Sequence, residues 1–239
     1  TEAGRRLYDK SRAITDALLD AEAAVRRSRD EAVGLVRISM PPVAATPDLL
    51  DALAATMAEH PGLAIELRVT RRELPGEGGV DLAVLVAPPP DTHGLVARRV
   101  PVQPWCLAAA PSYTTRRGLP RVPGDLAKHA CLRFSGDGPQ ASWTLHGPRG
   151  RAVTAPVGGA FESDDSRVLG DALYAGLGIG VRPTPELARG VAAGTLVAVL
   201  PRWRFALGSV YLVTTPGRRA LGRVAVVAEV VARAVRGPS

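Results

Sequence analysis

Residues 34–70 read GLVRISMPPVAATPDLLDALAATMAEHPGLAIELRVT, and they place an apolar strand, a helix and a second strand in succession. Thr46 is the predicted N-cap of the helix, which has proline at its first position and ends near residue 60 at a Pro-Gly pair. Alternating apolar and polar residues over 63–70 predict the second strand, and the apolar run 80–86 predicts a third. This succession indicates an α/β protein with a parallel sheet.

The remainder of the chain predicts a second α/β unit and a return to the first. The extended segment 95–110 is long enough to leave one sheet and enter another, and the strand over 209–215 can return to the first sheet. The other predicted elements are a short helix running into a strand (125–132), a hairpin (142–156), helices (163–174, 185–190 and 219–235) and strands (179–181 and 196–200). The predicted domains are a linker helix (1–32), a first subdomain (33–103 and 209–239) and a second subdomain (104–208).

Residues 1–25 predict a separate helix ahead of the first strand. Its apolar seam keeps a 4-3-4 spacing, which holds one narrow stripe toward a partner helix. The seam residues are Leu7, Ser11, Ile14, Leu18, Ala21 and Val25. Pairing with a second helix is favoured over docking on the chain's own domain, because a docked surface helix usually has a wider apolar stripe. We therefore predict dimerisation through this helix.

Composition and charge are those of an ordinary globular protein, with 239 residues of which 46% are apolar. No run approaches the roughly 20 apolar residues that span a bilayer, and the charged first helix has no signal segment, so we expect a cytoplasmic protein without membrane contact. The net charge of +7 arises entirely within residues 182–239, which hold nine Arg against two Glu. These arginines lack interleaved aromatic residues, which favours a solvated basic face over a nucleic-acid groove.

Residue types that carry catalysis or bind metals do not gather at useful spacings. Cys106 and Cys131 lie in separate segments and are expected to be reduced, partly buried thiols rather than a metal pair, a disulfide or a redox switch. The four histidines lie in four different segments, so no metal site is predicted. The glycines of 176–180 follow a helix and precede a strand, the reverse of a phosphate cradle. Without a nucleophile or an acid and base pair, we expect neither an enzyme nor a cofactor.

Binding without chemistry is the function that these exclusions leave. The loops 40–46 and 162–166 open helices at the carboxyl ends of strands, where backbone N–H groups can bind a small polar ligand in a cleft between two α/β lobes. Four aromatic side chains could line such a cleft, although each is more often part of a core or its rim. They are Trp105, Phe134, Trp203 and Phe205.

Short motifs in a fixed order extend over essentially the whole chain. They are TEAG (1–4), GLVRIS (34–39), HP (60–61), VDLAV (80–84), LVARR (95–99), APSY (110–113), DLAKHACL (125–132), AGLGI (175–179) and GTLVAVLP (194–201). Together they resemble the linker helix and effector-binding domain of the LysR-type transcriptional regulators. The resemblance implies a type 2 periplasmic-binding-protein fold, with two Rossmann-like subdomains and two crossover strands. It also implies a small-molecule inducer between the subdomains, and homodimers or homotetramers assembled through the linker helix.

Carried onto the matching positions, the resemblance implies an effector site built from several segments. The residues are Met40, Pro42, Val43, Ala44, Thr46, Ala87, Trp105, Phe134, Ser135, Ser163, Asp164, Asp165, Ser166, Val181 and Arg182. In this site Thr46 would offer a hydroxyl, Trp105 a stacking face, and Ser163 or Asp164 a polar anchor. Glu162, Asp164 and Asp165 open one helix and would repel an anion. We therefore expect a neutral or cationic effector, or one whose acid group lies only near residues 42–46.

One departure from the family and two alternatives bear on function. The family's N-terminal winged helix-turn-helix has no counterpart in these residues, so contact with promoter DNA is expected only through that missing domain. A solute-binding protein for uptake uses the same two-lobe fold, but it should carry a secretion signal and no heptad helix. An enzyme on this fold would need the acid, base and nucleophile that the sequence lacks.

Overall fold

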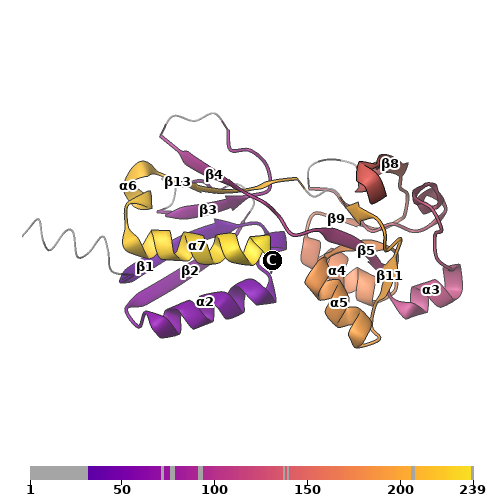
Figure 1. Ribbon diagram of the computed structural model, residues 1–239, viewed down its shortest axis with the longest axis horizontal. Coiled ribbons are helices and arrows are strands. Elements are labelled where there is room, and N and C mark those ends of the chain that lie inside the picture. The colour runs from indigo at the N-terminus through magenta and orange to yellow at the C-terminus, as the bar shows by residue number, and fades with distance from the viewer. Residues whose placement is uncertain are drawn as a thin grey trace, which may run out of the picture. The chain divides into compact units, whose positions relative to one another are not determined.

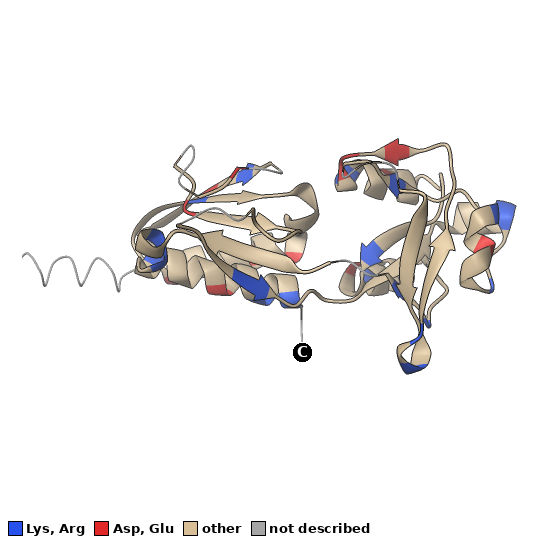
Figure 2. Ribbon diagram, turned by 90° about the horizontal axis from the view of Figure 1, so that it is seen from above, with Lys and Arg blue, Asp and Glu red and all other residues tan. Residues whose placement is uncertain are grey.

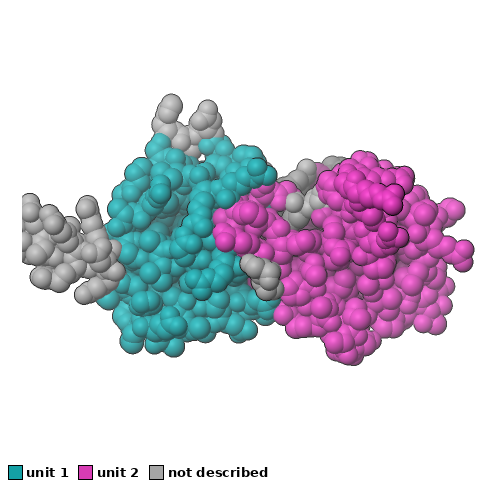
Figure 3. All heavy atoms as spheres, in the orientation of Figure 1, with its two compact units in different colours: residues 1–40, 47–99, 211–234 teal, residues 41–46, 100–210, 235–239 magenta. Residues whose placement is uncertain are grey.

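The computed structural model describes residues 32–70, 73–75, 79–90, 94–136, 138, 140–205 and 208–237. The predicted helix over 1–25, with its seam of Leu7, Ser11, Ile14, Leu18, Ala21 and Val25, lies outside these residues. The chain groups into two compact units (Figure 3). Unit 1 is drawn from residues 1–40, 47–99 and 211–234, and unit 2 from residues 41–46, 100–210 and 235–239. The short segment 41–46 thus belongs to unit 2, although unit 1 flanks it on both sides.

Unit 1 is a five-stranded sheet accompanied by helices (Figure 1). Its elements are β1 (Gly34–Met40), α2 (Pro47–Glu59), β2 (Leu63–Val69), β3 (Leu82–Leu85), β4 (Val96–Val100), β13 (Val210–Thr214), α6 (Pro216–Arg219) and α7 (Gly222–Arg236). The strand order is β2-β1-β3-β13-β4, so β2 and β4 are the edges. β1 runs parallel to β2 and β3, which confirms the predicted parallel sheet, and β13 is antiparallel to β3.

Each helix of unit 1 buries a stripe of side chains at helical spacing. In α2 the buried residues are Leu49, Leu53 and Thr56, and in α7 they include Val224, Val227 and Val231. Spacings of three and four residues keep such side chains on one helix face. The strand β1 carries the central apolar layer, with Val36, Ile38 and Met40 completely buried. The core of unit 1 therefore lies where these stripes meet the sheet.

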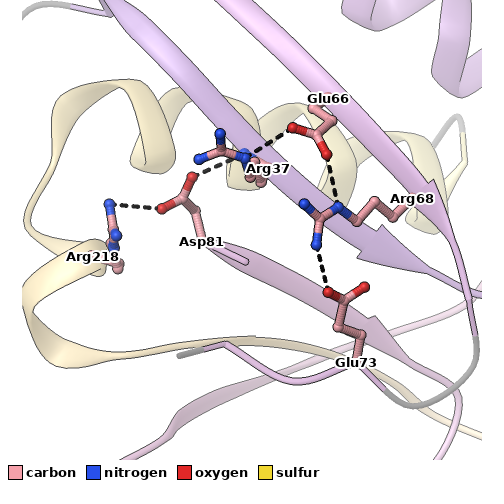
Figure 4. A network of polar contacts seen from close by, with 6 residues as sticks. All are labelled: Arg37, Glu66, Arg68, Glu73, Asp81 and Arg218. Carbon is pink, nitrogen blue, oxygen red and sulfur yellow. Dashed lines mark hydrogen bonds and ion pairs between the residues drawn. The ribbon is translucent and has the colours of Figure 1, made fainter. Parts of the chain in front are cut away.

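A network of charged side chains links the strands of unit 1 (Figure 4). Arg37 Nε on β1 donates to Glu66 on β2 at 2.8 Å, and Arg68 bridges Glu66 at 2.7 Å and Glu73 at 2.6 Å. Hydrogen bonds from the two arginines lower the pKa of Glu66, and Arg68 has the larger effect. A third acid, Asp81, pairs with Arg218 of α6 at 2.9 Å. Thus at least one of the C-terminal arginines has a structural partner.

Unit 2 contains a six-stranded sheet and a separate two-stranded sheet. The elements are η1 (Pro42–Ala44), β5 (Trp105–Ala109), α3 (Pro111–Arg117), η2 (Pro123–Lys128), β6 (Arg133–Phe134), β7 (Ser142–His146), η3 (Pro148–Gly150), β8 (Ala152–Pro156), β9 (Glu162–Ser163), α4 (Ser166–Tyr174), β10 (Gly180–Pro183), α5 (Thr184–Ala192), β11 (Val197–Val199) and β12 (Arg204–Phe205). The larger sheet has the order β10-β5-β12-β7-β8, with β11 also paired to β5. All five residues of β5 are buried, and this strand pairs with three others, β10, β11 and β12.

One predicted element is divided in the structure, one begins later than predicted, and helix α3 was not predicted. The extended segment 95–110 is two strands, β4 and β5, and they belong to different sheets. The helix predicted over 163–174 begins at Ser166, because Ser163 belongs to β9, which pairs with β6, and Asp165 is the N-cap. Helix α3 was missed, although its proline at the first position is a start signal.

The predicted passage of the chain between two α/β units is confirmed. The chain leaves unit 1 at the end of β4 and returns to it at the start of β13. One strand therefore lies at each of the two crossings. Among the residues that the structure describes, no helix is long and apolar enough to cross a membrane. Lys and Arg residues, blue in Figure 2, occur on elements of both units.

Candidate functional site

Most of the predicted site residues of unit 2 lie on elements that pack against one helix, α4. The elements η1, β5, β6, β9 and β10 each lie next to α4. They carry Pro42, Val43, Ala44, Trp105, Phe134, Ser163, Val181 and Arg182, and Ser135 directly follows β6. Strand pairing explains part of this gathering, since β6 pairs with β9 and β10 pairs with β5. Segments that are distant in the sequence therefore meet around α4.

The start of α4 is capped by its own carboxylate. Asp165 is the N-cap, and its side chain accepts a hydrogen bond from the backbone N–H of Arg167 at 2.8 Å. The Arg167 guanidinium also pairs with Asp165 at 3.1 Å, and these contacts lower the pKa of Asp165. Ser163 Oγ in turn accepts from the N–H of Asp165 at 3.1 Å. The side chains of Asp165 and Ser163 thus both form hydrogen bonds at the start of α4.

A second carboxylate at this helix opening also has an arginine partner. Glu162 forms an ion pair with Arg133, whose guanidinium further donates to the carbonyl oxygen of Gly159 at 2.9 Å. Two of the three acids that were expected to repel an anion are therefore neutralised locally. Asp164 is the carboxylate that keeps this role, so the predicted preference for a neutral or cationic effector rests on Asp164 alone.

Sequence reasoning missed Arg133 and Arg167 as parts of this region. The signal for Arg167 was its position two residues after Asp165, within reach of a helix N-cap. The position of Arg133 beside Glu162 depends on the pairing of β6 with β9. The sequence alone does not show which strands pair. Both arginines matter because they offset the negative charges of Glu162 and Asp165.

Arg182 is a buried cation that packs against α4. Its residue is 8% exposed, and its guanidinium lies so close to Gly170 that a Cβ there would be 2.3 Å from Nη2. The nearest acid is Glu186, whose carboxylate lies 3.3 Å from Arg182 Nε. Arg182 Nε is buried and has no hydrogen-bond partner among the residues that the structure describes. Any side chain at position 170 would therefore displace the Arg182 guanidinium from its present place.

The four aromatic residues that could line a cleft have different environments. Trp203 and Phe205 pack against the main core of unit 2, and Phe205 meets Trp143 edge-on with 5.9 Å between ring centroids. These two side chains belong to the core. Trp105 is also buried, with 6% of its surface exposed, and Phe134 is half-buried. Trp105 thus exposes little of a stacking face.

The two predicted site residues of unit 1 lie at the carboxyl ends of its parallel strands. Met40 is the last residue of β1 and is completely buried, whereas Ala87 lies two residues beyond β3 and is exposed. Thr46 belongs to unit 2 and precedes α2, and its N–H donates to the carbonyl oxygen of Ala44 at 3.0 Å. Carboxyl ends of parallel strands are a common place for ligand sites in α/β folds.

Both cysteines are free and buried. Burial raises the pKa of Cys131 to about 12, so its thiol stays protonated and unreactive at neutral pH. Cys106 Sγ lies 3.3 Å from the Thr184 hydroxyl. These environments favour structural thiols over a redox switch. Among the described residues, no group of three His, Cys, Asp or Glu side chains could hold a metal ion.

Similarity to known proteins is extensive in both sequence and fold. Residues 29–236 match the LysR substrate binding domain family. The HTH-type transcriptional activator AaeR of Escherichia coli (strain K12) is 30% identical over 217 residues, which cover 90% of this chain and 69% of AaeR. The full-length structure of the Vibrio cholerae virulence activator AphB is similar with a TM-score of 0.72 and 24% identity, covering 97% of this chain and 79% of AphB.

A regulatory domain solved by itself gives the same result. The regulatory domain of AphB in Vibrio vulnificus has a TM-score of 0.63 and 26% identity, covering 84% of this chain and 98% of that domain. These likenesses confirm the type 2 periplasmic-binding-protein fold and favour a regulator over the solute-binding alternative. The family match covers far more than half of the chain. The chain therefore belongs to the LysR-type transcriptional regulators and carries the effector-binding regulatory domain of that family.

Proposed function

We propose that a small-molecule effector binds at the elements around α4 and thereby controls transcription from the promoters that this regulator recognises. The observation that carries the proposal is the packing of η1, β5, β6, β9 and β10 against α4, because these elements bear most of the predicted site residues. Met40 and Ala87 of unit 1 complete the predicted set. The family consists of transcriptional regulators, which supports binding rather than catalysis as the role of this site.

The proposal also covers the partners of the chain. Homodimers or homotetramers would form through the helix that the sequence predicts over 1–25, and promoter DNA would be bound by a winged helix-turn-helix domain outside these 239 residues. AaeR is named as an HTH-type activator, which supports DNA as the final target. Regulators of this kind work on DNA, so we place the protein in the cytoplasm.

The contact chemistry around α4 narrows the effector. The carboxylates of Glu162 and Asp165 are paired with arginines, and Arg182 lies beside Glu186. Asp164 is therefore the acid that would meet a bound ligand at the helix opening, while Thr46 offers a hydroxyl. A compact ligand with one hydrogen-bonding group and no net negative charge fits these residues.

A matched set of probes tests the site and the charge together. Benzylamine, benzyl alcohol and benzoate share a ring and differ in charge, and their dissociation constants for this chain can be measured by ligand-observed NMR. We expect benzylamine and benzyl alcohol to bind more tightly than benzoate. Thr46→Ala should weaken binding by about five- to tenfold through a lost hydrogen bond. Thr144→Ala, an exposed threonine on β7, is the matched control and should bind like the parent.

Two results would contradict the proposal in different ways. If Thr46→Ala and the packing-conserving Trp105→Phe both leave every dissociation constant unchanged, the residues around α4 do not form the site. If only benzoate binds and Asp164→Asn tightens it, the site stands and the predicted charge preference is wrong.

A further inference from the structure

Unit 1 contains a pocket of about 430 Å³ between its sheet and the helices that follow β13. Its walls come from β3, β4 and β13 on one side and from α6 and α7 on the other, and all of its lining residues belong to unit 1. In Figure 1 these elements lie together in one half of the ribbon. The volume is in the range of small-molecule sites. The lining includes none of the residues around α4.

The floor of this pocket is apolar. Leu82, Leu212 and Val224 line it, and each is 1–3% exposed. Ala225 and Ala228 on α7 form one wall, and their short side chains leave the pocket open. Tightly packed interiors leave few voids of this size, so a hollow with such a floor can accept a short apolar group.

The rim of the pocket carries charge of both signs. Arg98 on the edge strand β4 donates a hydrogen bond to Glu229 on α7, and this bond raises the pKa of Arg98. Arg219, at the end of α6, also lines the pocket and forms no ion pair among the described residues. Its neighbour Arg218 instead pairs with Asp81. The rim therefore has one guanidinium in excess, available to an anion.

We propose that this pocket is an accessory site for a small monocarboxylate with a short apolar body. The carboxylate binds the Arg219 guanidinium, and the body lies on Leu82 and Val224. A guanidinium presents two parallel N–H donors to a carboxylate, which gives this contact both strength and orientation. The site is independent of the effector site proposed around α4, and its ligand preference is opposite in charge.

Three six-carbon probes test the charge that the rim selects. Hexanoate, 1-hexanol and hexylamine can be titrated into the 239-residue chain by ligand-observed NMR. We expect hexanoate to bind, 1-hexanol to bind roughly tenfold more weakly for want of the charged hydrogen bond, and hexylamine not to bind. Arg219→Gln should reduce hexanoate to the affinity of 1-hexanol. Arg233→Gln, an exposed arginine on α7 outside the pocket, should leave it unchanged.

Filling the pocket gives a second and independent measurement. Ala228→Phe should abolish binding of both hexanoate and 1-hexanol, whereas Ala54→Phe on the exposed face of α2 should not. If Ala228→Phe does not fold by circular dichroism, the Arg219→Gln result decides. Thr46→Ala should leave hexanoate binding unaltered, which separates this pocket from the site around α4.

Three outcomes would overturn the proposal. They are failure of hexanoate to bind the parent chain, equal binding to Arg219→Gln and the parent, and loss of hexanoate binding in Thr46→Ala. If hexanoate fails to bind because a second copy of the chain covers the pocket, Ala228→Phe should disrupt that contact between copies. Light scattering would then show a lower mass for Ala228→Phe than for Ala54→Phe.

Discussion

Asp81 of unit 1 and Asp165 of unit 2 find their hydrogen-bond and ion-pair partners in opposite ways. In unit 1, Asp81 is 2% exposed, accepts the backbone N–H of Arg37 at 2.9 Å and pairs with Arg218 at 2.9 Å (Figure 4). These partners come from β1 and α6, close to opposite ends of the described chain. In unit 2, the Asp165 side chain is 30% exposed and meets Arg167 two residues later. One acid joins distant segments, and the other shapes the helix that it precedes.

This difference predicts how much stability each acid contributes. A buried carboxylate that is removed leaves buried donors without an acceptor, and water cannot replace it. An exposed carboxylate at a helix start is replaced in part by water, so its loss costs less. Asp81 should therefore matter to the fold of unit 1, while Asp165 should matter mainly to the start of α4. The free energies of unfolding of variants at Asp81, Asp165 and Gly170, the glycine beside Arg182, measure this contrast.

The largest effect is expected at Asp81. Asp81→Ala removes the acceptor of the Arg37 N–H and the partner of Arg218, and we expect the free energy of unfolding to fall by about 3 kcal/mol. This value is at the low end for a buried pair because the Arg218 side chain is 45% exposed. Urea denaturation at pH 7 measures it. Asp51→Ala, an exposed acid on α2, is the control, and an equal loss in both variants would refute the contrast.

An intermediate effect is expected where α4 meets Arg182. Gly170→Ala would place a methyl group 2.3 Å from the present position of Arg182 Nη2, so the guanidinium must move away from its place beside Glu186. We expect a loss of about 1–2 kcal/mol, although alanine by itself favours a helix. The matched control is Gly217→Ala in α6, where a Cβ would meet no atom within 4 Å.

Urea denaturation of the two glycine variants separates packing from helix propensity. Gly217→Ala should be neutral or slightly stabilising, because it removes backbone entropy from the unfolded chain without a clash. If Gly170→Ala were as stable as Gly217→Ala, the Arg182 side chain would have a second low-energy position. The buried contact between Arg182 and α4 would then not fix the position of the Arg182 guanidinium.

Local signals in the sequence predicted elements of both units correctly. Thr46 with a following proline, and the Pro-Gly pair at residues 61–62, bracket a helix that the structure places at Pro47–Glu59. The hairpin over 142–156 was also confirmed as β7 and β8, paired in antiparallel fashion. These features depend on neighbours within a few residues, which is why one sequence is enough to predict them.

Long-range pairings could not be predicted in the same way. The partner of Glu162 depends on β6 lying beside β9, and the partner of Asp81 depends on α6 returning to the first sheet. The site residues were taken from a family resemblance, and the sequence did not show that their elements meet around α4. The same limit hid the arginine partner of Glu162, whereas Arg167, the partner of Asp165, lies only two residues along the chain.

The smallest effect is expected at Asp165. Asp165→Ala removes the carboxylate that caps α4, and the free energy of unfolding at pH 7 should fall by about 1 kcal/mol. Asp164→Ala is the control, because the Asp164 carboxylate makes no hydrogen bond or ion pair among the described residues. Urea denaturation of both variants beside the parent measures the difference.

The pH dependence of this loss distinguishes a working cap from a general change in charge. Hydrogen bonds from Arg167 lower the pKa of Asp165 in the folded chain, so its contribution is present above the ordinary aspartate pKa and disappears as pH falls through the lowered value. The parent and Asp165→Ala should therefore differ by a constant amount between pH 5 and pH 7 and converge in strongly acidic buffer. A difference that persists unchanged at the lowest pH at which the chain remains folded would mean that the carboxylate charge does not stabilise α4. The exposed local pair of unit 2 would then contribute through packing, and the contrast with buried Asp81 would have to be explained by contacts other than charge.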